Sequence, residues 1–177
     1  MTREKQKTKK SKWIVFKSSK IHSKGGFAAR DIPKKTKIIE YIGRVISKEE
    51  AEDLAAMELK KHRKDKEKGA VYIFELNKKY DIDGNVSWNP ARLINHSCLP
   101  NAKVEIKNDR IWIISRKKIK KGEEITYDYG YDLENWKDHP CRCGNKNCIG
   151  YIISRDEWTK FKKIKIKLGK KKKKRSQ

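Results

Sequence analysis

The sequence lacks any apolar stretch that could cross a lipid bilayer. A transmembrane helix needs about 18 consecutive apolar residues, and no run in this chain of 177 residues approaches that length. The chain starts Met-Thr-Arg-Glu-Lys-Gln-Lys, without the apolar segment of a secretory signal. These absences exclude an integral membrane protein, and we expect an intracellular protein of one domain in a reducing compartment.

Cysteine is also scarce, and a reducing compartment favours free thiols or metal ligands over disulfides. Cys141, Cys143 and Cys148 form a C-x-C-x4-C pattern, and Cys98, the fourth cysteine, lies upstream. Zinc prefers four soft ligands in a tetrahedron, and a short loop with glycine lets thiolates converge on one ion. One zinc ion bound by all four cysteines is the favoured interpretation, and ordinary buried or exposed cysteines are the alternative.

Acidic residues are in the minority, with 23 Asp and Glu against 47 Lys and Arg, and the excess lies at the two ends. Residues 1–12 carry six cations and one acid, and residues 159–177 carry eleven cations and no acid. The middle of the chain therefore has an ordinary globular composition, and both ends are expected to be mobile basic arms. Such arms attract DNA, RNA or acidic protein surfaces, or they only keep the protein soluble.

Short runs of strand-forming residues recur, each bounded by Gly, Asn, Asp or Pro; they cover residues 13–16, 37–42, 70–76, 103–106 and 111–115. Asn108-Asp109 separates the last two runs and predicts a hairpin turn. Ser47 to Glu50 forms a capping box, after which apolar residues follow at helical spacing. We therefore expect a mainly β domain with one inserted helix, over about residues 48–64, that ends by Gly69.

Three further segments carry residues suited to a binding site. The pair Gly25-Gly26 lets a backbone approach a ligand closely, but no Walker lysine or dinucleotide fingerprint accompanies it, so phosphate binding is not supported. Asn95-His96 follows the apolar pair Leu93-Ile94, which we expect to lie in a buried strand. Both side chains offer polar contacts, but for an isolated Asn-His pair the favoured interpretation is that they only satisfy local backbone groups.

The third segment holds three alternating tyrosines, Tyr127, Tyr129 and Tyr131, which would share one face of a strand. Packing in a β core is the alternative to a functional role. Residues 123–138 also hold six acids and one cation, in a chain that is otherwise basic. We expect a negative patch that attracts a peptide with a lysine, with a solvated acidic loop as the alternative.

Taken in this order, the segments resemble the SET-domain protein lysine methyltransferases from about Trp13 to Tyr151. The resemblance is carried by the segment 95–101 (Asn-His-Ser-Cys-Leu-Pro-Asn), the strand at 124–129 and the cysteine cluster, which corresponds to a post-SET segment. It implies an all-β fold of small sheets around a knot-like core, with the helix as a variable insert. The implied domains are a basic arm at 1–12, a SET domain at 13–136, a post-SET zinc segment at 137–153 and a basic tail at 154–177.

The resemblance also assigns site residues. It implies that S-adenosylmethionine is the cofactor, with S-adenosylhomocysteine as product. Tyr129 corresponds to the tyrosine nearest the transferred methyl group, and Tyr127 to the position that limits how many methyl groups are added. Cofactor-binding positions correspond to Lys24, Gly25, Gly26, Tyr72, Asn95, His96 and Tyr151, and zinc ligands to Cys98, Cys141, Cys143 and Cys148. Ser23 departs from the family, which usually has a glycine there, and Gly26 stands where a larger apolar residue is common.

The expected function is therefore methyl transfer to a lysine in the basic tail of a histone or other chromosomal protein, giving mainly mono- or dimethyllysine. Two alternatives stay open at this point. The chain could be a basic nucleic-acid-associated protein whose arms act, or a catalytically silent SET-like domain that only binds lysine-rich tails. The expected location is nuclear or chromosome-associated in a eukaryote, and cytoplasmic or at the nucleoid otherwise.

Overall fold

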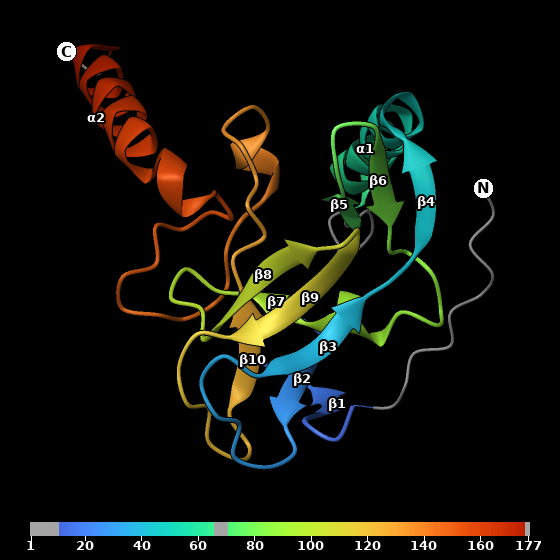
Figure 1. Cartoon of the computed structure of the whole chain (residues 1–177). Helices are drawn as coiled ribbons and strands as arrows, with labels where there is room; N and C mark the ends of the chain where they lie inside the picture. Colours follow the sequence, from blue (N-terminus) through green and yellow to red (C-terminus); the bar gives the residue numbers. More distant parts are fainter. Residues whose placement is uncertain (1–10, 66–70, 176–177) are drawn as a thin grey trace.

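The computed structural model describes residues 11–65 and 71–175, with side chains up to Leu168 (Figure 1). Three small β-sheets form the body of this part of the chain. Helix α1 (Lys48–Lys64) lies beside one sheet, and helix α2 (Trp158–Arg175) projects away from all three. In the described residues no helix combines the length and apolarity needed to span a membrane.

The first sheet joins segments that are far apart in the sequence. Its order is β1 (Ile14–Ser18), β2 (Lys24–Ala28), β10 (Glu124–Tyr127) and β7 (Asn95–His96). β7 runs parallel to β10, with Asn95 opposite Thr126 and His96 opposite Tyr127, and the other pairs are antiparallel. The expected strand at Leu93-Ile94 is wrong by two residues, because Pro90–Leu93 forms a 3₁₀ turn that leads into β7.

The second sheet has the order β3 (Lys37–Tyr41), β9 (Arg110–Ser115) and β8 (Ala102–Lys107). Lys107 pairs with Arg110, so Asn108 and Asp109 are the two loop residues, both with φ of 52°. This is the geometry of a type I′ turn, which favours Asn and Asp. The predicted hairpin is therefore confirmed.

The third sheet has the order β4 (Arg44–Ser47), β6 (Tyr80–Asp83) and β5 (Ile73–Glu75). The sequence predicts a strand at 70–76, and the structure gives residues 73–75 of it as β5. Strands β4 and β6 were not predicted. Both missed strands carry charged residues that pair with each other: Arg44 contacts Asp83 at 2.7 Å. These ion pairs reduce the apolar alternation by which a strand is recognised.

Isoleucine dominates the core between the sheets. Seven isoleucines that pack there are fully buried, namely Ile32, Ile38, Ile94, Ile111, Ile113, Ile119 and Ile125. β-Branched side chains suit strands because they pack against neighbours on the pleated surface. This core therefore supports the ends of β7 and β10, where the Asn95-His96 segment and the tyrosine segment meet.

Helix α1 begins as the sequence predicts. Ser47 is its N-cap, and the Ser47 hydroxyl accepts a hydrogen bond from the Glu50 backbone N–H at 3.2 Å. Ala51 is buried and the residues that follow it at helical spacing are half-buried, so this face packs against the domain. The helix ends at Lys64, and the expected limit at Gly69 lies outside the described residues.

Residues 158–175, which lie in the expected mobile basic arm, form helix α2. Two aromatic residues explain the start of this helix. Phe161 is fully buried, and the Trp158 indole N–H donates to the Ile153 carbonyl at 3.2 Å. The basic composition concealed these anchors. Two more 3₁₀ turns, Trp136–Asp138 and Arg155–Glu157, lie in the C-terminal appendage.

Candidate active site

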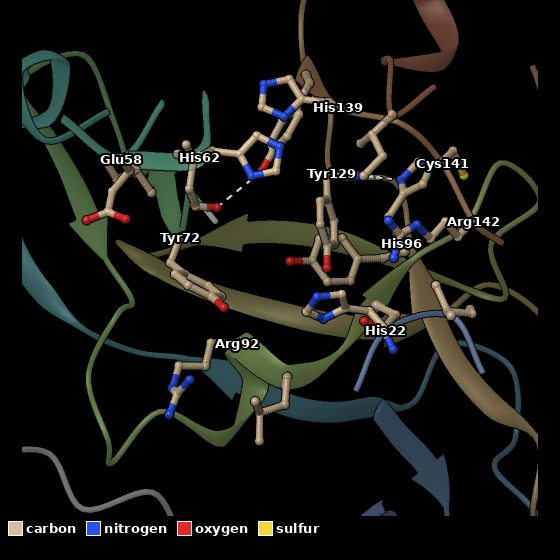
Figure 2. A pocket seen from close by; sticks show the side chains of 18 of the residues that line it. His22, Glu58, His62, Tyr72, Arg92, His96, Tyr129, His139, Cys141 and Arg142 are labelled. Carbon is tan, nitrogen blue, oxygen red and sulfur yellow. Dashed lines mark hydrogen bonds between the residues drawn. The ribbon is translucent and has the colours of Figure 1, made fainter. Parts of the chain in front are cut away.

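A cavity of about 470 Å³ lies where the first and third sheets meet α1 and the C-terminal appendage. Figure 2 shows that its labelled residues come from many parts of the chain, with Glu58 and His62 on α1 and His139 to Arg142 on the appendage. The lining also includes Ile21 to Lys24, Val71 to Phe74, Arg92, Leu93, Asn95, His96 and the tyrosines at 127, 129 and 131. This volume is within the range of small-molecule sites.

Asn95 is fixed by three hydrogen bonds from its amide nitrogen. The acceptors are the Glu124 carboxylate at 2.8 Å, the Lys24 carbonyl at 3.0 Å and the Ser19 hydroxyl at 3.2 Å. Ser19 also donates to Glu124 at 2.7 Å. Because Nδ2 is used in this way, the Asn95 side chain holds β2 and β10 together at the edge of the cavity.

His96 is buried, and its hydrogen bonds decide its tautomer. The Tyr129 backbone N–H donates to His96 Nδ1 at 3.2 Å, so Nδ1 carries no proton. A neutral ring must then be protonated at Nε2, and Nε2 lies 3.8 Å from Cys98 Sγ. His96 thus connects the cavity to the cysteine cluster, as an acceptor on one side and a donor to sulfur on the other.

The tyrosines line the cavity together, as the sequence predicts. The ring centroids of Tyr127 and Tyr129 are 5.0 Å apart, and those of Tyr129 and Tyr131 are 5.7 Å apart. Only Tyr127 belongs to a strand, because the chain turns at Gly130, where φ is +73°. Their common position therefore comes from a turn after β10 rather than from one strand face.

The Tyr129 hydroxyl donates a hydrogen bond to the Ile94 carbonyl at 3.0 Å. Burial raises the pKa of Tyr129 and of Tyr127 well above the ordinary value of 10.0. Both phenols are therefore protonated at neutral pH, and neither can act as a base there. What Tyr129 offers to the cavity is a fixed hydroxyl oxygen and an aromatic face.

Tyrosine hydroxyls also hold the opposite wall. Tyr41 donates to the Tyr72 carbonyl at 2.8 Å, and Tyr131 donates to the Val71 carbonyl at 3.2 Å. Gly84 N–H donates to the same Tyr72 carbonyl at 2.9 Å. Tyr72 therefore faces the cavity from a segment that is anchored by hydrogen bonds to three other parts of the chain.

The other predicted cofactor contacts are placed differently. Lys24 lines the cavity, whereas Gly25 and Gly26 do not. Both glycines are buried in β2, and a Cβ on Gly25 would lie 2.3 Å from Glu124 Oε1. Close strand packing thus accounts for Gly25. Tyr151 also lies outside the cavity lining, with its ring against Trp136 at 4.5 Å and Phe161 at 5.7 Å.

The four cysteines converge on one point, as the sequence predicts. Their sulfur atoms all lie within 4.8 Å of one another, and Cys98 Sγ is 3.7 Å from the sulfurs of Cys141 and Cys148. The hydrogen bond between Cys98 and Cys141 lowers the pKa of Cys98 and raises that of Cys141. Four thiols at this spacing, with no carboxylate or open position among them, fit a structural zinc ion.

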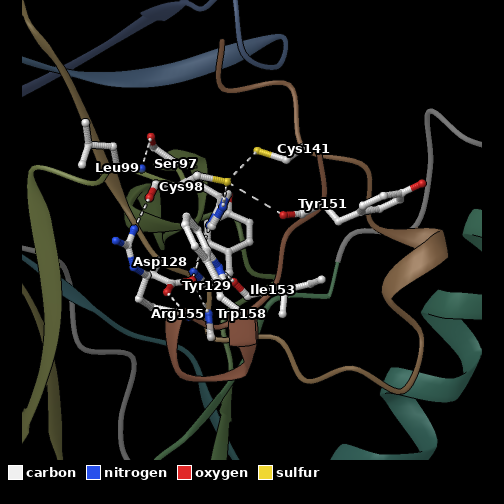
Figure 3. A network of polar contacts seen from close by, with 12 residues as sticks. Ser97, Cys98, Leu99, Asp128, Tyr129, Cys141, Tyr151, Ile153, Arg155 and Trp158 are labelled. Carbon is white, nitrogen blue, oxygen red and sulfur yellow. Dashed lines mark hydrogen bonds and ion pairs between the residues drawn. The ribbon is translucent and has the colours of Figure 1, made fainter. Parts of the chain in front are cut away.

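Hydrogen bonds tie the cysteine segment to the rest of the site. Asn145 donates to the Ser97 hydroxyl at 2.7 Å. The Arg155 guanidinium donates to the Cys98 carbonyl at 3.3 Å (Figure 3). On the other side of the cavity, Arg63 of α1 contacts Asp138 at 2.9 Å and Asn135 at 3.1 Å. The appendage is therefore fixed both to the segment that follows β7 and to the inserted helix.

The expected acidic patch is partly exposed and partly engaged in hydrogen bonds within the chain. Four of its carboxylates accept hydrogen bonds within the chain: Glu124 from Ser19 and Asn95, Asp128 from the N–H groups of Gly130 and Arg155, Asp132 from the Glu134 N–H, and Asp138 from Arg63. Among the described residues, the cavity lining contains Glu58 and Asp138 but also Lys24, Arg92 and Arg142. The expectation that residues 123–138 attract a peptide with a lysine therefore stays a prediction.

Comparison with known proteins identifies the family. The sequence model of the SET domain matches residues 23–130. This chain belongs to the SET-domain family. The match includes β2, α1, β7 and β10, which carry the cavity, and it ends before Cys141, Cys143 and Cys148. The predicted fold, with small sheets, an inserted helix and a cysteine-bearing appendage, is confirmed.

Relatives of this SET domain are named for an enzymatic activity. It is 40% identical over 140 residues to histone-lysine N-methyltransferase 2D of Homo sapiens, covering 76% of this chain and 2% of that protein. It is 36% identical over 148 residues to the Schizosaccharomyces pombe "Histone-lysine N-methyltransferase, H3 lysine-4 specific", covering 81% of this chain and 15% of that protein. The chain thus spans a small part of the length of these curated relatives.

A solved structure has the same fold as this SET domain. It is described as "crystal structure of KRYPTONITE in complex with mCHG DNA and SAH", with a TM-score of 0.61 and 26% identity. The match covers 78% of this chain and 28% of that chain.

Several lining residues were missed by the sequence analysis of this SET domain. Ser23 lines the cavity and has a positive φ of 22°. The signal that could have indicated this was its position, where the family usually has a glycine. Arg92 lies directly before the recognised Asn-His segment and was passed over. Nothing in the sequence indicated that Glu58 and His62 line the cavity. Helical spacing shows which side of α1 packs against the protein, but not which residues or which cavity it faces.

Proposed function

We propose that this SET domain is an S-adenosylmethionine-dependent protein-lysine N-methyltransferase. The observation that carries the proposal is one cavity lined by Asn95 and His96 of β7 and by Tyr129, which follows β10, the strand that pairs with β7 in parallel. Relatives named histone-lysine N-methyltransferases support a histone tail as substrate. A lysine in the basic tail of a histone or of another chromosomal protein is the proposed target.

The residues of the cavity suit the cofactor. The aromatic faces of Tyr72, Tyr129 and Tyr131 favour a cationic sulfonium, and the cations of Lys24 and Arg92 favour the carboxylate of an amino acid. When bound, S-adenosylmethionine supplies a methyl group on positively charged sulfur. A role for Gly25 and Gly26 through their backbone, and for Tyr151 as a cover for adenine, stays a prediction.

The chain must receive the substrate amine in its neutral form. A lysine with a pKa of about 10.4 has to lose a proton at pH 7, which costs about 4.6 kcal/mol at roughly 1.36 kcal/mol per unit. Since the phenols of Tyr127 and Tyr129 stay protonated, they do not remove this proton. Removal from water and the positive charge of the sulfonium would disfavour the ammonium form instead. Tyr129 then orients the amine, and alignment of the reacting atoms is worth several kcal/mol.

The four cysteines would hold one zinc ion with a structural role. The ion would use all four positions for sulfur, so it would have none for water or substrate. Its service is to fix the appendage, whose residues His139 to Arg142 form one wall of the cavity.

Tyr127 is proposed to limit the product to mono- or dimethyllysine. Its ring lies between Phe74, at 5.8 Å, and Tyr129, at 5.0 Å, so its position is fixed by packing. The hydroxyl occupies space that further methyl groups would need. Tyr127→Phe should therefore add methyl groups to the product, as read by mass spectrometry, and ready trimethylation by the wild type would contradict the proposal.

The test of the function is methyl transfer from labelled S-adenosylmethionine to a panel of histones and bacterial or archaeal chromosomal proteins. Tyr129→Phe is the matched variant, since it keeps the ring and removes the hydroxyl. Transfer by the wild type and a large loss in the variant are expected. If calorimetry finds no cofactor binding and no protein is labelled, a silent SET-like binding protein becomes the better description.

The substrate class also determines the expected place of the protein, which is at chromosomes, in the nucleus if the cell has one. The basic ends are proposed to contact DNA or RNA there. The N-terminal arm falls largely on residues outside the described part of the chain.

A further inference from the structure

Helix α2 is attached to the wall of the cavity by an aromatic cluster. The Phe161 ring packs against Trp136 at 5.0 Å and Tyr151 at 5.7 Å. Tyr151 in turn pairs with Pro140 in a β-bridge, and Pro140 lines the cavity. The first turns of α2 therefore have a defined position relative to the site, although the helix projects away from the sheets (Figure 1).

The side of α2 away from this cluster carries a row of lysines. Lys160, Lys163 and Lys167 are all exposed, and they recur at intervals of three and four residues, about one helical turn. The same spacing continues in the sequence at positions 170 and 174, which are also lysine. Residues 158–175 contain no acid, and among the described lysine side chains of α2 only Lys160 has an ion pair, with Glu157 at 2.9 Å.

Such a row is unfavourable for an isolated helix, because like charges three or four residues apart repel each other. A polyanion that follows the helix removes this repulsion and releases counterions when it binds. A regular row of exposed cations on a fixed helix thus matches a regular array of phosphates.

We propose that helix α2 is a binding element for duplex DNA, which contacts the phosphate backbone through Lys160, Lys163 and Lys167. The choice of DNA among polyanions rests on the proposed function, since a chromosomal substrate is bound to duplex DNA. The arrangement of the apolar residues on α2 argues against binding to a membrane surface, because they do not form one apolar face. Ile166 and Leu168 are exposed, but they lie two positions apart, on nearly opposite sides of the helix, and Phe161 is already covered.

The anchored position of α2 gives this contact a consequence for the site. Phosphates bound along the lysine row lie at a fixed place relative to the cavity wall formed by the appendage. DNA-bound protein tails are therefore presented near the site, whereas free peptides gain nothing from α2. This predicts that α2 matters for DNA-bound substrates and not for isolated peptides.

The binding test uses the full chain and a labelled DNA duplex of about 20 base pairs, followed by fluorescence anisotropy from about 50 to 200 mM salt. The variant replaces Lys160, Lys163 and Lys167 together by Gln, which keeps helix propensity. With a slope of about 0.9 per phosphate contact, the log–log salt dependence should decrease by roughly 2 to 3. Circular dichroism checks that α2 stays helical.

The control makes the same change at Lys117, Lys120 and Lys121, exposed lysines between β9 and β10. The control should bind DNA with the salt dependence of the wild type. An equal loss in both triple variants would show that net charge alone binds DNA, and no loss in the α2 variant would overturn the proposal. Tighter binding of duplex RNA or of anionic vesicles would overturn the choice of DNA.

A methylation assay separates this proposal from the proposed function. The α2 variant should methylate a free histone peptide like the wild type, and a DNA-bound histone several-fold more slowly. The anisotropy measurement does not depend on catalysis. DNA binding without methyl transfer would therefore contradict the proposed methyltransferase function but not the proposed DNA binding by α2.

Discussion

Asn101 offers a sharp test of what holds the tyrosine strand in place. Its side chain binds β10 as a neighbouring strand would, because Nδ2 donates to the Glu124 carbonyl at 2.8 Å and Oδ1 accepts from the Thr126 N–H at 2.9 Å. Asn101 and Thr126 are both buried. Asn101→Ala removes both contacts and leaves two backbone groups of β10 without these partners.

The cost follows from the burial of those groups. An unsatisfied buried donor or acceptor costs about 1–3 kcal/mol, so two give about 2–6 kcal/mol. This is a large share of the 5–15 kcal/mol that ordinarily separates a folded domain from its unfolded chain. Urea unfolding followed by tryptophan fluorescence, in buffer with zinc, should show this loss as a lower midpoint with an unchanged slope.

Two further variants control the argument. Asn147 is exposed, so Asn147→Ala should change the free energy of unfolding by less than about 0.5 kcal/mol. Asn101→Asp keeps the acceptor for Thr126 but sets a carboxylate against the Glu124 carbonyl, and it should not restore the stability. A loss below about 1 kcal/mol in Asn101→Ala would refute the view that β10 depends on this side chain.

Two other predictions concern the metal and the pH. Elemental analysis should find one zinc ion per chain, and chelation or Cys98→Ser should lower the melting temperature, because the appendage then loses its cross-link; an unchanged melting temperature would contradict a structural ion. The rate with a peptide substrate should rise about tenfold per pH unit between pH 7 and 9, because the substrate lysine loses its proton while burial keeps the raised pKa of Tyr129 above this range. Tyr129→Phe should lower the rate at every pH and leave the slope of the pH–rate profile unchanged. A flat pH–rate profile in this variant would identify the phenol, and not the substrate lysine, as the titrating group.

Local chemistry explains which parts of the fold could be predicted. Ser47 and Glu50 are three residues apart and cap the same turn, and Asn108-Asp109 suits a turn with two positive φ angles. Each of these signals involves a few neighbouring residues. The cysteine cluster was predictable for a different reason: three ligands lie within eight residues, which restricts where the fourth can be.

Contacts between distant segments explain what could not be predicted. Asp128 and Arg155 are 27 residues apart in the sequence, yet the Arg155 N–H donates to the Asp128 carboxylate at 3.0 Å. A sequence gives the charge of a side chain but not its partner. For the same reason α1 could be predicted as a helix, while the contribution of Glu58 and His62 to the cavity could not.

The C-terminal helix shows how composition can conceal structure. Net charge described residues 159–177 as one basic arm, yet the residues that decide their structure are the few apolar ones. Phe161 is fully buried against Trp136 and Tyr151, and burial of an aromatic side chain contributes about 1.5–3 kcal/mol. One such anchor outweighs several like-charge pairs at about 0.2–0.5 kcal/mol each. Replacing Phe161 by Lys should therefore reduce helicity at 222 nm far more than any single change among the exposed lysines of α2.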